Sequence, residues 1–128
     1  MSDVLVLRLP LPHASLSPNA RVYWTESAKE KARAKEQAKT AMIGAKHQFS
    51  QESKLRLTLI VFWKDRRKRD LDNLQASCKA MIDGIFTVLQ LNDEQINEIT
   101  TIRGPLNKND PHIKCYIQEI TDEVHCHK

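Results

Sequence analysis

The residues best suited to chemistry are two aspartates, Asp70 and Asp72, which stand two positions apart directly after a run of basic residues. In extended backbone, side chains two positions apart point to the same side, whereas inside a helix they diverge by about 200°. Asp72 is also of a type that caps helices well, and as a cap it would leave Asp70 in the extended residues before the helix. In that arrangement the two carboxylates are able to share one cation.

A third acid and a metal ion complete the predicted site. Two carboxylates amid so much positive charge would repel a polyanion unless a divalent cation screens them. Mg²⁺ takes carboxylate, water and phosphate oxygens, as in phosphodiester hydrolysis. Asp93, in the turn Asn92-Asp93-Glu94-Gln95, is a candidate third ligand. The strand expected after this turn is able to pair beside the strand at residues 54–63, which would place the site at the end of the sheet.

Lys79 is the candidate for direct assistance. It lies seven residues beyond Asp72, which in a continuous helix is about 700° of rotation and about 10.5 Å along the axis. That separation is too long for a simple ion pair with Asp72, but it lets the ammonium reach a phosphate bound over the site. There the charge could steady an attacked phosphorus or a departing oxygen. Asp83 falls on the same helix line.

Positive charge is concentrated in one short segment. Residues 64–69 carry five basic side chains and one acid, a local charge of +4 that equals the net charge of the whole chain. The basic residues are Lys64, Arg66, Arg67, Lys68 and Arg69. Such a cluster attracts polyanions and releases their counterions, so nucleic acid is the leading partner class.

Each of these features also has a simpler interpretation. A lone Asp-x-Asp is more often a turn or a cap than a metal site, and Asp93 could simply start a turn. The basic run could be a solvated hairpin or a nonspecific tether. Lys79 and Asp83 stand four residues apart, where a surface ion pair is the default. Spacing alone therefore indicates a basic domain with a candidate carboxylate metal site.

Length and composition indicate one folded domain, since the 128 residues are 41% hydrophobic and 28% charged. A domain this small favours an active site built between symmetric copies of the chain. We expect residues 1–120 to form it and residues 121–128 to be a flexible tail. No apolar stretch approaches ~20 residues and residues 1–10 lack a secretion pattern, so we expect a cytoplasmic protein with no membrane partner and no nucleotide cofactor.

The three cysteines are odd in number and lack Cys-x-x-Cys spacing, which argues against a disulfide framework and against a zinc site. Cys78 and Cys115 fall within apolar patterns, so we expect them to be core thiols. Cys126, between His125 and His127, lies in the expected tail.

Hydrophobic periodicity predicts an α+β domain in the order β-α-β-α-β-β. Alternation indicates strands at residues 4–9 and 55–63. Helices are expected from a Thr25 cap to about Lys46, with small residues such as Ala28, Ala32 and Ala38 on the apolar face, and as five continuous turns over residues 71–89. Residues 95–103 and 112–120 are expected to form a pair of strands joined by a turn. The result is a mixed sheet with helices packed on one face.

Several of these segments also form one longer pattern. The run at residues 66–74, Arg-Arg-Lys-Arg-Asp-Leu-Asp-Asn-Leu, is followed by Lys79, Asp83 and the segment 92–96. An early loop adds Ser17, Pro18, Asn19, Ala20, Arg21 and Trp24. This pattern resembles the RusA family of Holliday-junction resolvases, over roughly residues 4–120, with the early loop similar to the family's proline and asparagine motif.

The resemblance implies an intertwined homodimer that cuts four-way DNA junctions symmetrically with Mg²⁺ or Mn²⁺. It implies that Asp70, Asp72 and Asp93 bind the metal and that Lys79 is catalytic, although this chain has three more residues between Asn73 and the lysine than the shorter family pattern. Candidates to support the ligands are Asn73, Asp83, Asn92 and Glu94. Candidates to bind DNA are Lys64, Arg66, Arg67, Lys68, Arg69, Asn19 and Arg21. The family is common in phages and prophages, which favours such an origin.

The leading hypothesis is therefore a metal-dependent, structure-specific endodeoxyribonuclease of DNA recombination and repair. Metal-bound water would attack in line and leave 5′-phosphate and 3′-hydroxyl ends, and two sites in a dimer would make paired nicks. One alternative is a nonenzymatic basic DNA-binding protein, against which the acids at the DNA face argue. The other is a metal-dependent ribonuclease with a similar acid cluster.

Overall fold

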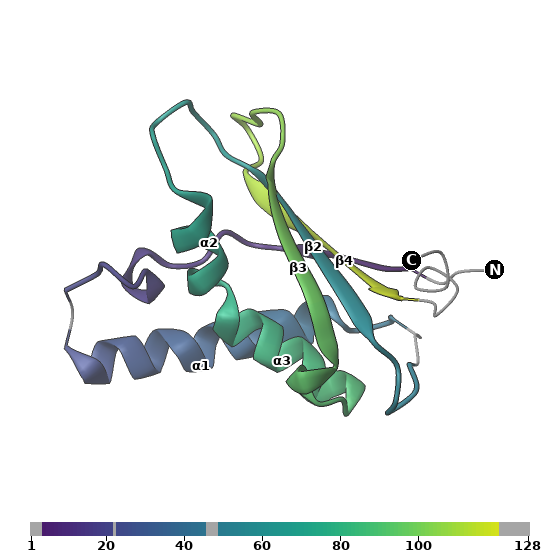
Figure 1. Cartoon of the computed structure of the whole chain (residues 1–128). Helices are drawn as coiled ribbons and strands as arrows, with labels where there is room; N and C mark the ends of the chain where they lie inside the picture. The colour runs from purple at the N-terminus through teal and green to yellow at the C-terminus, as the bar shows by residue number, and fades with distance from the viewer. Residues whose placement is uncertain (1–3, 22, 46–48, 121–128) are drawn as a thin grey trace.

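The computed structural model describes residues 4–21, 23–45 and 49–120, so the predicted tail at 121–128 lies outside the described residues. Figure 1 shows the arrangement of the strands and helices. In chain order they are β1 (Val4–Leu9), η1 (Ala14–Leu16), α1 (Trp24–Ala41), β2 (Leu55–Phe62), α2 (Leu71–Ser77), α3 (Lys79–Leu89), η2 (Asp93–Gln95), β3 (Ile96–Arg103) and β4 (His112–Glu119). The α+β class and the alternation of strands with helices are confirmed.

The strands form one mixed sheet in the order β1-β4-β2-β3. β2 and β3 are parallel, with Leu57 opposite Ile99, whereas β4 is antiparallel to both β1 and β2. The expectation that the strand after Asp93 lies beside the earlier strand is confirmed. The expectation that β3 and β4 form a pair was wrong, because β2 lies between them. The long turn at residues 104–111 crosses over the end of β2 instead of closing a hairpin.

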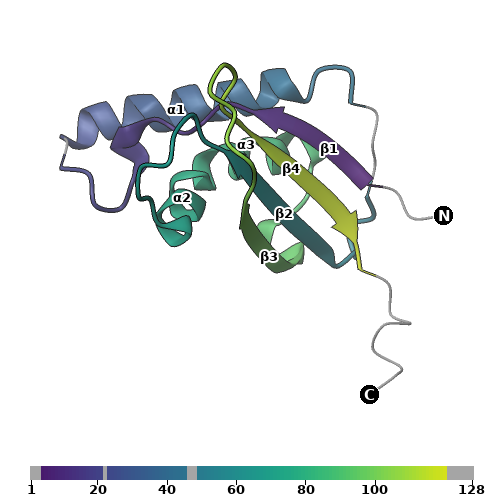
Figure 2. The same cartoon turned by 90° about the horizontal axis from the view of Figure 1, so that it is seen from above.

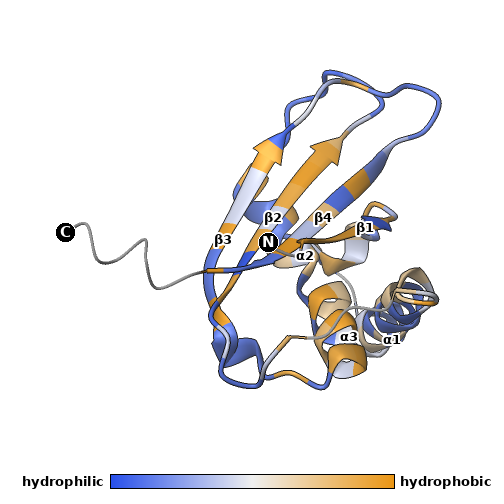
Figure 3. Ribbon diagram, turned by 90° about the vertical axis from the view of Figure 1, so that its right-hand side faces the viewer, coloured by the Kyte–Doolittle hydropathy of each residue, from blue (hydrophilic) through white to orange (hydrophobic). Residues whose placement is uncertain are grey.

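The core lies on one face of the sheet. Every second residue of β2, from Leu55 to Val61, is fully buried, and so are Ile113 and Ile117 of β4. Helices α1 and α3 cover this face, as Figures 2 and 3 show from two directions. The opposite face carries partly exposed side chains such as Thr58 and Tyr116. This one-sided burial agrees with the alternation seen in the sequence.

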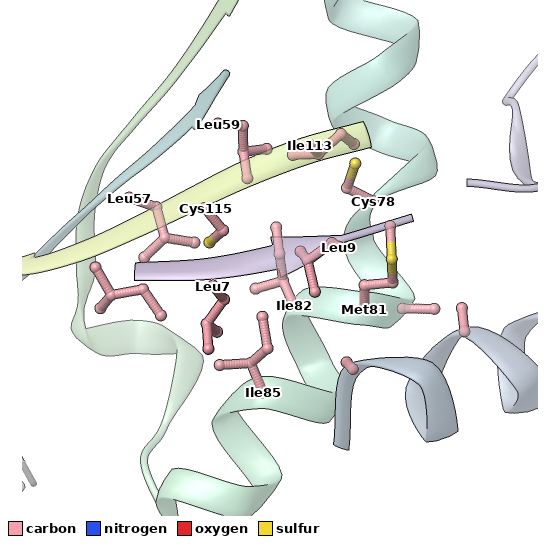
Figure 4. Packing of buried hydrophobic residues seen from close by; sticks show 14 of the residues in the cluster. Leu7, Leu9, Leu57, Leu59, Cys78, Met81, Ile82, Ile85, Ile113 and Cys115 are labelled. Carbon is pink, nitrogen blue, oxygen red and sulfur yellow. The ribbon is translucent and has the colours of Figure 1, made fainter. Parts of the chain in front are cut away.

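The two predicted core thiols are confirmed. Cys78 and Cys115 are free and fully buried among the aliphatic side chains drawn in Figure 4. Burial raises the pKa of each thiol to about 12, because the thiolate loses its hydration in an apolar environment. Both thiols are therefore protonated and unreactive at neutral pH.

The second predicted helix is broken. Residues 71–89 form two helices, α2 and α3, that meet at Cys78, where ψ is −2° and the backbone N–H bonds to the carbonyls of both Leu74 and Gln75. The two halves pack on different partners: α2 lies against η1 and β3, whereas α3 lies against α1. The break allows each half to follow its own partner, and it changes the geometry on which the Lys79 prediction relied.

Helix α1 differs from expectation in its ends and in its buried face. It begins at Trp24 after an N-cap at Tyr23, not at Thr25. It ends at Ala41, because Gly44 takes a left-handed φ of +84° soon afterwards. Glu30, Ala34 and Ala38 are buried, whereas the predicted Ala28 and Ala32 are exposed.

The close approach of α1 to α3 explains which face is buried. A Cβ atom on Gly84 of α3 would lie 2.8 Å from the carbonyl oxygen of Lys35 and 3.1 Å from the Cβ of Ala38. Only a glycine there lets the two helices approach so closely. In the part of the chain that the structure describes, no helix is long and apolar enough to cross a membrane.

Candidate nuclease site

Asp70 and Asp72 stand at the start of α2, but in different backbone conformations. Asp70 is the N-cap residue, with φ −89° and ψ 132°, and Asp72 lies in the first turn. The prediction that Asp72 caps the helix was wrong by two residues, because Leu71 is already helical. The Asp70 side chain makes no capping hydrogen bond, and both carboxylates are exposed. Because one residue is extended and the other helical, their side chains do not share the common direction expected from an extended pair.

Asp72 and Asp93 come together around one hollow. This depression, of about 360 Å³, lies between α2, α3 and the start of β3. Asp72, Lys79, Asp83 and Asp93 contribute its charged side chains, and we call it the acidic hollow. Part of its wall is apolar, formed by Ile82, Ile96 and Ile99. The structure thus brings together four of the residues singled out from the sequence, although they come from three different elements.

Asp70 lies in a second hollow. This depression, of about 770 Å³, is lined by Lys64, Lys68, Asn73 and His13 as well as by Asp70, and we call it the loop hollow. Asp70 does not line the acidic hollow. The three aspartates that the sequence grouped are therefore divided between neighbouring depressions at the two sides of the α2 N-terminus.

The donors of the acidic hollow suit a hard divalent cation. Asp72, Asp83 and Asp93 offer carboxylate oxygens at one exposed place, and Mg²⁺ commonly binds a protein through one or two carboxylates while keeping several waters. Among the described residues, no three His, Cys, Asp or Glu side chains are close enough to hold an ion by themselves. A cation bound here would therefore take part of its ligands from water and substrate.

Lys79 is the first residue of α3, directly after the break. Its Nζ lies 3.7 Å from a carboxylate oxygen of Asp83, and its side chain is 72% exposed. The two side chains therefore form the surface ion pair that was the simpler interpretation of their spacing. An ion pair this exposed contributes little to stability. Lys79 nevertheless projects into the acidic hollow beside Asp72 and Asp93, where its charge is available to a phosphate.

Asp93 is held in place by its neighbours. Asn92 is the cap of η2: its side chain accepts the backbone N–H of Glu94, while the Gln95 side chain accepts the N–H of Asn92. Gln95 also donates to the carbonyls of Ser50 and Ser53, 3.0 Å away. Asn92, and not Asp93, thus caps η2, and Asp93 lines the acidic hollow.

The basic residues belong to a loop between β2 and α2, which we call the basic loop (residues 64–69). The ring of Trp63, only 6% exposed, lies just before it. The guanidinium carbons of Arg69 and Arg103 lie 5.2 Å and 4.8 Å from the ring centroid. Arg103 also donates to the backbone carbonyl of Arg69, 2.9 Å away. These contacts attach the end of the basic loop to the end of β3.

Asp65 organises the same loop from within. Its carboxylate accepts the backbone N–H of Arg67 at 3.0 Å and pairs with Arg69 at 2.9 Å. The hydrogen bond from Arg67, followed by the interactions with Arg69, lowers the pKa of the Asp65 carboxyl below its usual value. Arg69 is thus largely committed to the protein, whereas Lys64, Arg66, Arg67 and Lys68 are exposed.

The remaining predicted DNA-binding residues, Asn19 and Arg21, are exposed between η1 and α1. The backbone N–H of Asn19 bonds to the Ser17 hydroxyl at 3.3 Å. They line neither the acidic hollow nor the loop hollow. The structure therefore does not bring them into either hollow with the predicted aspartates.

Sequence reasoning missed two residues. His13 lines the loop hollow with Asp70, and its Nδ1 accepts the backbone N–H of Ser15 at 3.1 Å. No spacing signal connects it to the aspartates across so much chain. Arg103 was missed as well, although the parallel pairing of Val61 with Arg103 puts it beside Trp63. Recognising that pairing would have been enough to find it.

Comparisons with known proteins identify the family of this chain. No curated protein matches the chain. Among solved structures, the hydrogenase maturation protein HypE in complex with ATP is 12% identical, with a TM-score of 0.29, over 97% of this chain and 32% of that chain. The chain thus spans about a third of the length of that protein. The sequence profile of the endodeoxyribonuclease RusA family matches residues 13–118, which include the acidic hollow, the basic loop and all but two of the residues that line the loop hollow. The chain therefore belongs to the RusA endodeoxyribonuclease family.

Proposed function

We propose that this nuclease cuts four-way DNA junctions in a reaction that depends on a divalent metal ion. The observation that carries the proposal is the convergence of Asp72, Asp93 and Lys79 on one exposed hollow near a basic loop. Acids gathered beside a DNA-binding surface are costly for a protein that only binds DNA, since they repel phosphates. They are useful to a protein that hydrolyses a phosphodiester.

Mg²⁺ is the proposed cofactor, with Mn²⁺ as a substitute. Asp72 and Asp93 are the proposed ligands in the acidic hollow, with Asp83 beside them. Asp70, which is exposed and makes no capping hydrogen bond, is proposed as the third ligand from the edge of the loop hollow. Such an ion lowers the pKa of a bound water and offsets charge on the phosphate.

The protein side chains would position the substrate. Exposed Lys64, Arg66, Arg67 and Lys68 contact backbone phosphates without reading sequence. Lys79 places its ammonium over the acidic hollow, where it would neutralise charge on the phosphate that is being cut. Asn92 and Gln95 hold the turn that carries Asp93.

Two copies of the chain are proposed to act together, because one chain supplies one set of these acids and a symmetric junction needs two nicks. An intertwined homodimer working on branched DNA during recombination or repair would meet that need. We place its activity in the cytoplasm, and hydrolysis at this site calls for no nucleotide cofactor.

A synthetic four-way junction tests the proposal directly. The protein is incubated with the junction, with a linear duplex of the same sequence and with a branched RNA of matched sequence, each with Mg²⁺ and with EDTA. We expect paired nicks near the crossover of the DNA junction only, and only with Mg²⁺. Binding without cleavage would show a nonenzymatic DNA-binding protein, and preferential cleavage of the RNA would show a ribonuclease.

A further inference from the structure

Helix α1 carries basic side chains along two lines on opposite sides. Lys29 and Arg33 are four residues apart on one line, and Lys31 and Lys35 are four apart on the other. Because two residues of helix correspond to about 200° of rotation, these lines face nearly opposite directions. All four side chains are exposed, so exposure alone does not distinguish them.

The packing of α1 turns one of these lines toward the nuclease site. The buried residues Ala34 and Ala38 and the contact of Gly84 with the Lys35 carbonyl hold α1 against α3. Lys31 and Lys35 line a hollow of about 310 Å³ together with Ser77, Lys79 and Asp83. Lys29 and Arg33 line neither this hollow nor the acidic hollow.

Lys35 also lines a fourth depression, of about 590 Å³, which includes Lys79, Asp83 and Asp93. Lys79 and Asp83 are thus common to this depression, to the one with Lys31, and to the acidic hollow. Two α1 lysines therefore border the same concave region as the proposed metal ligands. This placement is not visible in the sequence, where the lysines precede Asp72 by about forty residues.

No ion pair between described residues uses the charge of these two lysines. On the same helix, Arg33 lies 3.9 Å from a Glu30 oxygen and Lys39 lies 3.4 Å from a Glu36 oxygen. Asp83, which lines two hollows together with Lys35, is paired with Lys79. Among the described residues, neither Lys31 nor Lys35 has a carboxylate within 4.0 Å, and each keeps its charge available to an external anion.

The site therefore lies between two basic surfaces. In Figure 1, α2 and the beginning of α3 are located between the basic loop and α1. The acidic hollow belongs to this intermediate part of the molecule, since Asp72 is in α2 and Lys79 and Asp83 are in α3. A backbone that crosses the acids would meet positive charge on both sides.

We propose that Lys31 and Lys35 bind backbone phosphates of the DNA on the side of the acidic hollow away from the basic loop. The proposal rests on the proposed junction-cutting function and deepens it. The DNA would contact the basic loop, cross the acids and continue over α1. The ligand class is the phosphodiester backbone, and no base is read by these lysines.

The test compares two charge-matched double variants of the full chain. One is Lys31→Gln with Lys35→Gln. The control is Lys29→Gln with Lys114→Gln, which removes the same charge from the opposite line of α1 and from the uncovered face of the sheet. Equilibrium binding to the four-way junction is measured between 50 and 200 mM salt in Ca²⁺, with circular dichroism confirming that both variants fold.

We expect the slope of log affinity against log salt to become less steep by about 1.8 for Lys31→Gln with Lys35→Gln, since each lost phosphate contact removes about 0.9. The control should keep the parental slope, and Lys31→Arg with Lys35→Arg should restore it. Equal slopes for the two Gln doubles would overturn the inference.

The outcomes also separate this inference from the function on which it rests. If the parental protein neither binds nor cuts junctions, the proposed function itself is wrong. If the parent cuts junctions while the α1 double variant behaves like its control, only the role of the two lysines is wrong.

Discussion

At the scale of single residues, the acids differ in what already surrounds them. Asp83 is paired with Lys79, and Asp70 caps α2 geometrically without bonding to its N–H groups. Asp72 stands in the first turn of α2, where the partial positive charge of the helix N-terminus favours a carboxylate. It also shares a hollow with both Lys79 and Asp93 and, unlike Asp83, is not paired with Lys79. Asp72 is therefore the residue on which the proposed chemistry most depends.

Changing Asp72 to Asn should stop cleavage while leaving binding intact. The substitution keeps the shape of an exposed side chain but removes a metal-binding charge, so single-turnover cleavage with Mg²⁺ should fall by about 10²-fold or more. Junction affinity should be unchanged or higher, because a negative charge near the DNA is lost. Glu52→Gln, at an exposed turn, is the control. Parental cleavage by Asp72→Asn at saturating Mg²⁺ would remove Asp72 from the site.

Lys79→Ala separates a catalytic lysine from an ion-pair partner. If the ammonium stabilises charge during cleavage, the single-turnover rate should drop by about 10²-fold with junction affinity near the parental value. If it only pairs with Asp83, the rate should persist and the unfolding free energy should change by well under ~1 kcal/mol. We expect the first result, and measuring the rate and the unfolding midpoint on one preparation decides between them.

At the scale of elements, the basic loop is divided by the role of its arginines. Arg69 lies over Trp63, pairs with Asp65 and receives a bond on its carbonyl from Arg103. Arg66 is exposed and lies on the outer part of the loop. Both were expected from the sequence to bind DNA. Their contacts indicate that Arg69 chiefly stabilises the conformation of the loop.

Arg69→Gln should therefore mainly lower stability, whereas Arg66→Gln should mainly weaken the salt dependence of DNA binding. Loss of the contact with the buried Trp63 ring should lower the unfolding free energy by about 0.5–1 kcal/mol or more in Arg69→Gln, whereas Arg66→Gln should leave it near parental. The salt dependence of junction binding should weaken by about 0.9 in slope for Arg66→Gln. Urea unfolding followed by tryptophan fluorescence, with salt titrations of binding, measures both. Equal destabilisation by the two changes would contradict this division.

At the scale of the whole molecule, a one-sided sheet supports a site on its helical side. The helices pack on one face, and the acids gather where α2, α3 and the start of β3 meet. Positive charge lies on two sides of that point, in the basic loop and on α1. A single chain therefore presents one charged track with one set of acids, which suits one strand of a symmetric junction.

Mixing active and inactive chains tests the proposed pairing of two copies. Parental protein and Asp72→Asn are unfolded together and refolded in equal amounts, so that about half of the dimers contain one chain of each kind if association is random. On a junction in a supercoiled plasmid, these mixed dimers should leave single nicks in place of linear product. Nicked and linear DNA are separated on a gel. Sedimentation as a monomer under cleavage conditions would exclude the paired arrangement.

Local patterns in the sequence were sufficient for the elements and for most members of the site. Alternation in residues 55–61 identified a half-buried strand, because burial of one sheet face forces period two. Motif spacing selected Asp72, Lys79, Asp83 and Asp93, and the structure places all four around one hollow. The two core thiols followed from the same apolar patterns. Each of these inferences needed only neighbours along the chain.

Tertiary packing decided the rest, because it depends on contacts between segments distant in sequence. Hydrophobic periodicity does not say which strands are neighbours, so the insertion of β2 between β3 and β4 was missed. The break at Cys78 arises because α2 and α3 pack on different partners. Because α2 begins at Leu71, Asp70 and Asp72 differ in backbone conformation, and they line different hollows. The contact between Gly84 and Lys35 turns two lysines of α1 toward acids that lie about forty residues away in the chain.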